Sequence, residues 1–106
     1  MNPIETIRVR LDGGRHWCQG GPIGFSRAGL PAVCLLLALE QDDERAYALQ
    51  DRLISHVIEE QFPERRTPGD GYASPIPSFN DHPATTWHDV DLVLHKAALL
   101  ADERAA

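Results

Sequence analysis

Two cysteines and several histidines are the residues of this sequence whose types suit metal binding. Thiolate and imidazole groups are the ligands that zinc prefers in proteins. The candidate ligands are Cys18, Cys34, His16 and either His82 or His88. The sequence has no Cys-x2-Cys or His-x3-His pair, the spacing that places two ligands on one turn. We therefore predict no metal and no cofactor. The weak metal candidates are Cys18, Cys34, His16 and His82.

The same cysteines are the candidates for a thiol nucleophile, with a histidine as the base. The sequence around Cys18 and Cys34 matches no local motif of a cysteine enzyme. Both cysteines also fit a simpler interpretation as packing residues, Cys34 at the start of a central helix and Cys18 beneath the loop that carries Trp17. Because the first twenty residues show no secretory signal, we expect a cytoplasmic protein whose cysteines stay reduced.

Two loop segments carry polar residues that could contact a partner. The segment 80–83, Asn-Asp-His-Pro, could present a polar site, but it is more typical of a turn whose side chains bond the backbone leading into the last helix. The segment 19–21, Gln-Gly-Gly, could bind an anion through backbone N–H groups, although it matches neither nucleotide-binding motif. Trp17 and Trp87 are more typical of core aromatics than of a platform for stacking bases. The candidate partner-binding residues of these segments are Trp17, Gln19, Asn80 and Asp81.

The net charge of −6 limits the kind of partner. Binding to nucleic-acid phosphates needs clustered Lys and Arg, which this chain does not have, so we predict no direct nucleic-acid binding. The run Glu40–Glu44, together with Glu59, Glu60 and Glu64, could form one negative face that mimics nucleic acid towards a basic target. A solvated surface with favourable helix-dipole placement explains the same residues and is the favoured interpretation. Glu59 and Glu60 complete the set of candidate partner-binding residues.

Length and hydrophobic periodicity predict one domain, residues 1–106, in the all-α class. The longest apolar run, Ala32–Leu39, is far short of the roughly 20 residues that cross a bilayer, so we predict no membrane span. We expect a small bundle of three to four helices. The predicted helices run from Pro3 to about Asp12, over 32–39 as a short buried central helix, over about 43–61, and over about 86–103.

Two long ordered loops connect these helices, Arg15–Pro31 and Pro63–Pro83. The first could include a minor β-ribbon near residues 22–33, and we expect its apolar members to pack onto the core. These apolar members are Trp17, Ile23, Phe25 and Leu30. The second contains five prolines and has an exposed, mobile middle around 67–74.

Three groups of residues, spread along the chain, together resemble a known family. The groups are Trp17-Cys18-Gln19-Gly20; Gly29-x-Pro31-x-Val33-Cys34-x-Leu36; and Asn80-Asp81-x-Pro83 ahead of Val90-x3-Leu94-x2-Ala97. They are similar in order and spacing to domain of unknown function 6197, a family of small proteins from actinobacterial and phage genomes. The resemblance implies a single compact domain, frequently on mobile elements, and it transfers no functional residues.

From these observations we expect a non-enzymatic, protein-binding accessory domain associated with a phage or mobile element. An acidic inhibitor of a host nucleic-acid-binding or defence complex is a second hypothesis. A metal- or thiol-dependent enzyme is a third. We expect a protein partner, and a homodimer is compatible with the sequence.

Overall fold

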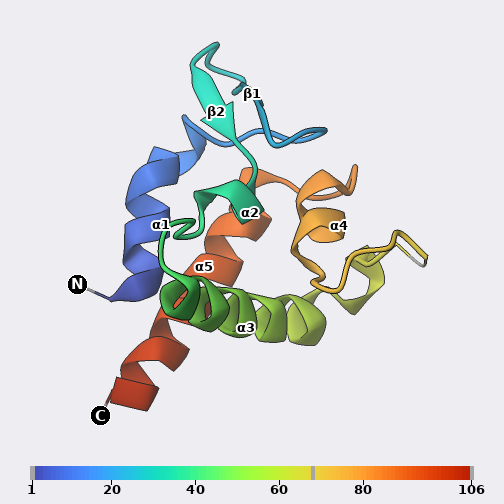
Figure 1. Cartoon of the computed structure of the whole chain (residues 1–106). Coiled ribbons are helices and arrows are strands. Elements are labelled where there is room, and N and C mark those ends of the chain that lie inside the picture. Colours follow the sequence, from blue (N-terminus) through green and yellow to red (C-terminus); the bar gives the residue numbers. More distant parts are fainter. Residues whose placement is uncertain (1, 68, 106) are drawn as a thin grey trace.

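The computed structural model describes residues 2–67 and 69–105 of the chain (Figure 1). Its helices are α1 (Pro3–Leu11), α2 (Leu35–Ala38), α3 (Glu44–Gln61), α4 (Ile76–Asp81) and α5 (Trp87–Ala105), with 3-10 turns at Asp12–Gly14 and Pro63–Arg65. Strands β1 (Ile23–Phe25) and β2 (Pro31–Val33) form an antiparallel ribbon. The mostly helical prediction is confirmed and the minor ribbon is present. The all-α description and the helix count are inexact, because the described residues form a ribbon and five helices.

The long helices begin and end where their capping residues predict. Asn2 accepts a hydrogen bond from the Ile4 N–H at 2.8 Å, ahead of a proline at the first helical position. Asp43 caps α3 in the same way through two backbone N–H groups. Helix α3 stops just before Phe62, because the following proline disfavours the helical conformation there.

Helix α5 begins with a capping box formed by Thr86 and Asp89. The Asp89 N–H donates to Thr86 Oγ1 at 3.4 Å, and the Thr86 N–H donates to Asp89 Oδ2 at 3.1 Å. Beyond the cap, a stripe of small and branched apolar residues is buried against α1 and α3. Within the described residues, none of the helices has both the length and the hydropathy that a bilayer span requires.

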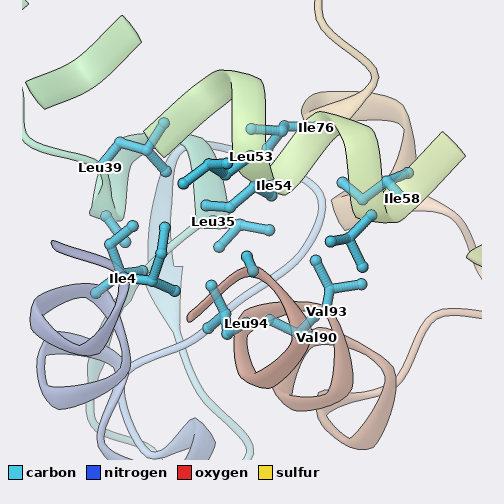
Figure 2. Close-up of a cluster of buried hydrophobic side chains, with 14 of the residues drawn as sticks. Ile4, Leu35, Leu39, Leu53, Ile54, Ile58, Ile76, Val90, Val93 and Leu94 are labelled. Carbon is cyan, nitrogen blue, oxygen red and sulfur yellow. The ribbon is translucent and has the colours of Figure 1, made fainter. Parts of the chain in front are cut away.

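The core lies where α1, α3 and α5 meet (Figure 2). Helices α2 and α4 also contribute to it, through Leu35, Ile76 and Phe79. Its fully buried side chains include Ile4, Ile7, Leu11, Leu35, Leu39, Ile54, Ile76, Phe79, Val90 and Leu94. The polar side chain of Gln50 is also buried, and both of its amide atoms are hydrogen-bonded. It donates to the Pro3 carbonyl at 3.0 Å and accepts from the Glu40 N–H at 2.7 Å, which ties α1 and the segment after α2 to α3.

The predicted central helix over 32–39 is wrong in extent, because α2 is a single turn. Ala32 and Val33 instead belong to β2, where they pair with Gly24 and Ile23. The helix begins only after Cys34, whose Sγ accepts the Leu37 N–H at 3.4 Å. Strand pairing across the hairpin turn therefore outweighs the good helix propensity at the start of this apolar run.

The interpretation of 63–83 as irregular is also wrong in part, because α4 lies within it. Helix α4 begins at Ile76 with Pro77 in its first turn, where a missing N–H removes no intrahelical hydrogen bond. The middle of this segment, 67–74, is exposed at most of its described positions, and Pro68 lies outside the described residues. Arg66 bonds the carbonyls of Tyr72 and Ala73 across it.

Candidate functional site

Asn80, in the last turn of α4, joins three segments that are far apart in sequence. Its Oδ1 accepts the Trp17 indole N–H at 2.7 Å and the Leu35 backbone N–H at 2.9 Å. Its Nδ2 donates to the Cys18 carbonyl at 3.1 Å and to Asp81 Oδ1 at 2.8 Å. Asn80 is only 1% exposed. The predicted turn is therefore wrong: the Asn80 side chain bonds the Trp17 loop and the start of α2, not the backbone leading into α5.

Gln19 and Asp81 strengthen the same connection. Gln19 Nε2 lies within hydrogen-bond distance of the carbonyls of Asn80, His82 and Thr85, at 2.9, 3.1 and 3.0 Å. Asp81 Oδ1 accepts the Gly20 N–H at 2.9 Å. Four of the six candidate partner-binding residues are thus brought together, but they hold the loop against α4. These four residues would therefore act on a partner indirectly, because they hold in place the surface that the loop presents.

That loop covers one edge of the ribbon. The Val33 N–H donates to the His16 carbonyl at 2.9 Å, and the Cys18 N–H donates to the Val33 carbonyl at 3.1 Å. The His16 ring adds a contact from Nδ1 to the Pro31 carbonyl at 2.7 Å. The outer edge of β2 is therefore paired along its length.

The outer edge of β1 is open. The Ser26 N–H donates to the Leu30 carbonyl, and the Cys34 N–H donates to the Pro22 carbonyl. Since hydrogen-bonded and non-hydrogen-bonded residue pairs alternate along an antiparallel ribbon, these two bonds fix which pairs of β1 and β2 are hydrogen-bonded. By that alternation Gly24 pairs inward with Ala32, whereas the N–H and carbonyl groups of Ile23 and Phe25 point outward. Among the described residues, none bonds these outward groups.

Ile23 and Phe25 also expose their side chains, 74% and 73% respectively. The prediction that they pack onto the core is therefore wrong. The opposite face of the ribbon is the one that packs down: a Cβ on Gly24 would lie 3.5 Å from Cys18 Sγ, and Ala32 is buried. The ribbon extends beyond the helices (Figure 1). Both apolar side chains are exposed on it.

A cavity of about 380 Å³ lies between the ribbon turn, the loop and the start of α5. It is lined by Gly13, Gly14, Arg15, Trp17, Cys18, Gln19, Phe25, Ser26, Arg27, Ala28, Thr85, Thr86 and Trp87. The Trp17 and Trp87 rings meet at its wall, with centroids 6.0 Å apart. The hydroxyl of Ser26 is buried and has no hydrogen-bond partner in the part of the chain that the structure describes.

The charge of this end of the molecule differs from that of the whole chain. Residues 13–39 contain two arginines and no Asp or Glu, although the full chain has a net charge of −6. The two arginines are Arg15 and Arg27, and both line the cavity. We did not single out Arg15, Ser26 or Arg27 from the sequence, yet the stretch without acids was a signal that could have found the arginines.

Cys18 lies beneath this loop and is buried, as the sequence predicts. Burial raises the pKa of the Cys18 thiol, and Cys34 and Asp81 nearby raise it further. Since the thiolate is the nucleophile, this environment works against a thiol enzyme. Both cysteines are free thiols.

The weak metal candidates are used in other contacts. His82 Nδ1 accepts the Ala84 N–H at 3.0 Å, and Cys34 Sγ caps α2. Within residues 2–67 and 69–105, no group of three or more His, Cys, Asp or Glu residues is placed to hold a metal ion.

The two acidic candidates for partner binding lie on α3, away from the loop and the ribbon. Glu59 and Glu60 belong to the end of α3, where Glu59 Oε1 lies 3.4 Å from Arg66 and Glu60 Oε2 lies 3.7 Å from His56. The exposed residues Arg45 and Arg52 share this helix. The surface of α3 therefore has both signs of charge.

A family model described as a family of unknown function, DUF6197, matches residues 4–100. The match covers nearly the whole chain. The chain belongs to DUF6197. Neither a curated protein nor a solved structure matches it. The region shared with DUF6197 includes Asn80, the ribbon and every residue that lines the cavity.

Proposed function

We propose that this DUF6197 protein is a non-enzymatic protein-binding domain, and that a partner adds an extended segment to the outer edge of β1. The observation that carries the proposal is an open strand edge with two exposed apolar side chains, Ile23 and Phe25. Association with a phage or mobile element remains a proposal that rests on the resemblance alone.

An open edge is a ready template for another strand. Proteins that avoid such pairing place Lys, Pro or inward-pointing charges on their edges. The edge strand here, Ile-Gly-Phe, has no Lys, Pro or charge, and its short length of three residues is what limits pairing. In strand addition, main-chain hydrogen bonds supply affinity and alternate side chains supply specificity. Ile23 and Phe25, with their outward N–H and carbonyl groups, provide both.

The charge of this region favours an acidic partner segment. Arg15 and Arg27 are the only charged residues between Asp12 and Glu40. An extended segment with Asp or Glu beside its apolar residues would complement them. Pairing of β1 with β1 of a second copy would instead bring two arginine-bearing ribbons together, so a different protein is the favoured occupant.

The acidic-inhibitor hypothesis uses a different surface, at Glu59 and Glu60. It remains a separate proposal and has less support than the ribbon edge. The reason is that Arg45, Arg52 and Arg66 place positive charge on or beside α3.

The test is affinity capture from an extract of the native cells, with the full chain as bait. Phe25→Thr keeps the outward N–H and removes the apolar side chain. Phe25→Pro removes both, and the lost N–H serves no hydrogen bond within the ribbon. We expect Phe25→Thr to weaken binding of the captured protein about tenfold or more, and Phe25→Pro to weaken it further.

Val9→Thr is the matched control. Val9, at 67% exposed, is a similarly exposed apolar residue on α1, so its replacement should leave capture unchanged. Equal capture by the wild-type chain and both Phe25 variants would overturn the proposal. So would light scattering that shows a dimer of this chain dissociated by Phe25→Pro, because the second copy would then be the occupant.

A further inference from the structure

We propose that the cavity between the ribbon turn and the start of α5 binds a small organic anion with an aromatic or apolar body, such as an aryl carboxylate. This inference concerns a free small molecule. It goes beyond the binding of a protein at β1 and does not depend on it.

The size and walls of the cavity suit such a ligand. Its volume of about 380 Å³ falls in the range of small-molecule sites, roughly 300 to 1,000 Å³. Trp17, Trp87 and Phe25 provide aromatic surface. The two tryptophan rings are tilted by 52° to each other, which leaves a bent aromatic wall for a flat hydrocarbon group.

The polar lining selects an anion. Arg15 and Arg27 line the cavity, and no Asp or Glu does so, although acidic residues outnumber basic ones in the chain by 16 to 10. A guanidinium binds a carboxylate through two parallel hydrogen bonds. The Asp12 carboxylate, which is not among the lining residues, lies 4.0 Å from Arg15 Nε and offsets part of its charge. Arg27 has no acidic partner among the described residues, so it is the main positive charge that the cavity offers to an anion.

The start of α5 adds to this field. Thr86 and Trp87 line the cavity, and α5 has 19 residues. The Asp89 N–H is capped by Thr86, whereas the N–H groups of Trp87 and His88 have no partner in the residues that the structure describes. Free N–H groups and the helix dipole favour an anion here, although the Asp89 carboxylate in the first turn already offsets part of this field.

Ser26 lies at the wall of the cavity. The residue is only 9% exposed, and its hydroxyl is without a partner among the described residues. A buried polar group without a hydrogen bond is costly. Because the hydroxyl is closed off from solvent in this conformation, the Ser26 side chain has to rotate before a carboxylate in the cavity can accept its O–H.

Tryptophan fluorescence of the full chain can test this proposal. Trp17 and Trp87 are the two tryptophans of the sequence and both line the cavity, so their emission reports on it directly. The probe is 3-phenylpropanoate, and its uncharged counterpart is 3-phenylpropanol. We expect a saturable emission change with the carboxylate, and binding of the alcohol about tenfold weaker or more.

Substitutions test whether the carboxylate probe binds in the cavity. Arg27→Gln, in the exposed turn, should weaken binding of the carboxylate about tenfold without lowering the melting temperature. Arg52→Gln on α3 should have no effect. The proposal is overturned if the alcohol binds as well as the carboxylate, if Arg27→Gln changes nothing, or if no saturable change occurs up to millimolar probe.

Discussion

Replacing Asn80 with alanine is expected to lower the free energy of unfolding by roughly 3 to 5 kcal/mol. The Asn80 side chain satisfies the Leu35 N–H, the Trp17 indole N–H and the Cys18 carbonyl. Its removal leaves buried backbone groups unpaired, and each of these costs about 1 to 3 kcal/mol. Because small domains have only about 5 to 15 kcal/mol of stability, this single change removes a large share. Urea denaturation followed by circular dichroism measures it.

Trp17→Phe is the matched control for Asn80→Ala. It removes one of the donors to Asn80 Oδ1 and keeps an aromatic ring beside Trp87. The Leu35 N–H still finds its acceptor, so we expect a loss of only about 1 kcal/mol. A loss below 1 kcal/mol for Asn80→Ala would contradict the role of Asn80 as the residue that joins α4, α2 and the loop.

Gly14→Ala is expected to cost about 2 to 4 kcal/mol, for two reasons. Gly14 has a φ of +91°, a conformation that side chains with a Cβ rarely adopt. A Cβ there would also lie 2.8 Å from Trp87 Cγ and 2.9 Å from Cδ2, within the indole at the start of α5. The measurement is the midpoint of thermal unfolding, followed by the combined emission of Trp17 and Trp87.

Gly13→Ala separates strain from crowding. Gly13 also has a positive φ, of +63°, but a Cβ there would meet no atom within 4 Å. We therefore expect it to cost only about 1 kcal/mol, from backbone strain alone. Equal losses for the two variants would mean that the contact between Gly14 and Trp87 does not matter for the fold.

The sequence predicts the long helices well because their signals are local. Asn2, Asp43 and the pair Thr86 and Asp89 cap their helices as their side-chain chemistry requires. The short elements follow less directly from propensity. Ala32 and Val33 have neighbours typical of a helix, yet they pair with β1 across a hairpin turn, and α4 forms although Pro75 precedes it and Pro77 lies in its first turn. Propensity does not report the pairing and packing that decide these short elements.

The candidate site was predictable in part. Trp17, Gln19, Asn80 and Asp81 do lie together, but mutual hydrogen bonds, which no local pattern reveals, turn Asn80 inward. The exposure of Ile23 and Phe25 was not predictable, because an alternating strand does not say which of its faces is buried. Here Gly24 and Ala32 supply the buried face, although both have small or absent side chains.

These contacts explain how the fold presents the ribbon. Asn80 fixes the loop, the segment 16–18 covers the outer edge of β2, and the edge of β1 is left open. The same loop forms a wall of the cavity. Residues that a partner would not need to contact, Asn80 above all, therefore hold the proposed functional surface in position.

Amide hydrogen exchange, on the chain alone and bound to the captured partner, tests the ribbon-edge proposal most directly. In the free chain, the outward amides of Ile23 and Phe25 should exchange fast, and the Gly24 amide, which pairs with Ala32, should exchange more slowly. In the complex, we expect the Ile23 and Phe25 amides to become protected while those of α3 change little. Protection confined to α3, with the Ile23 and Phe25 amides still exchanging fast, would contradict the account.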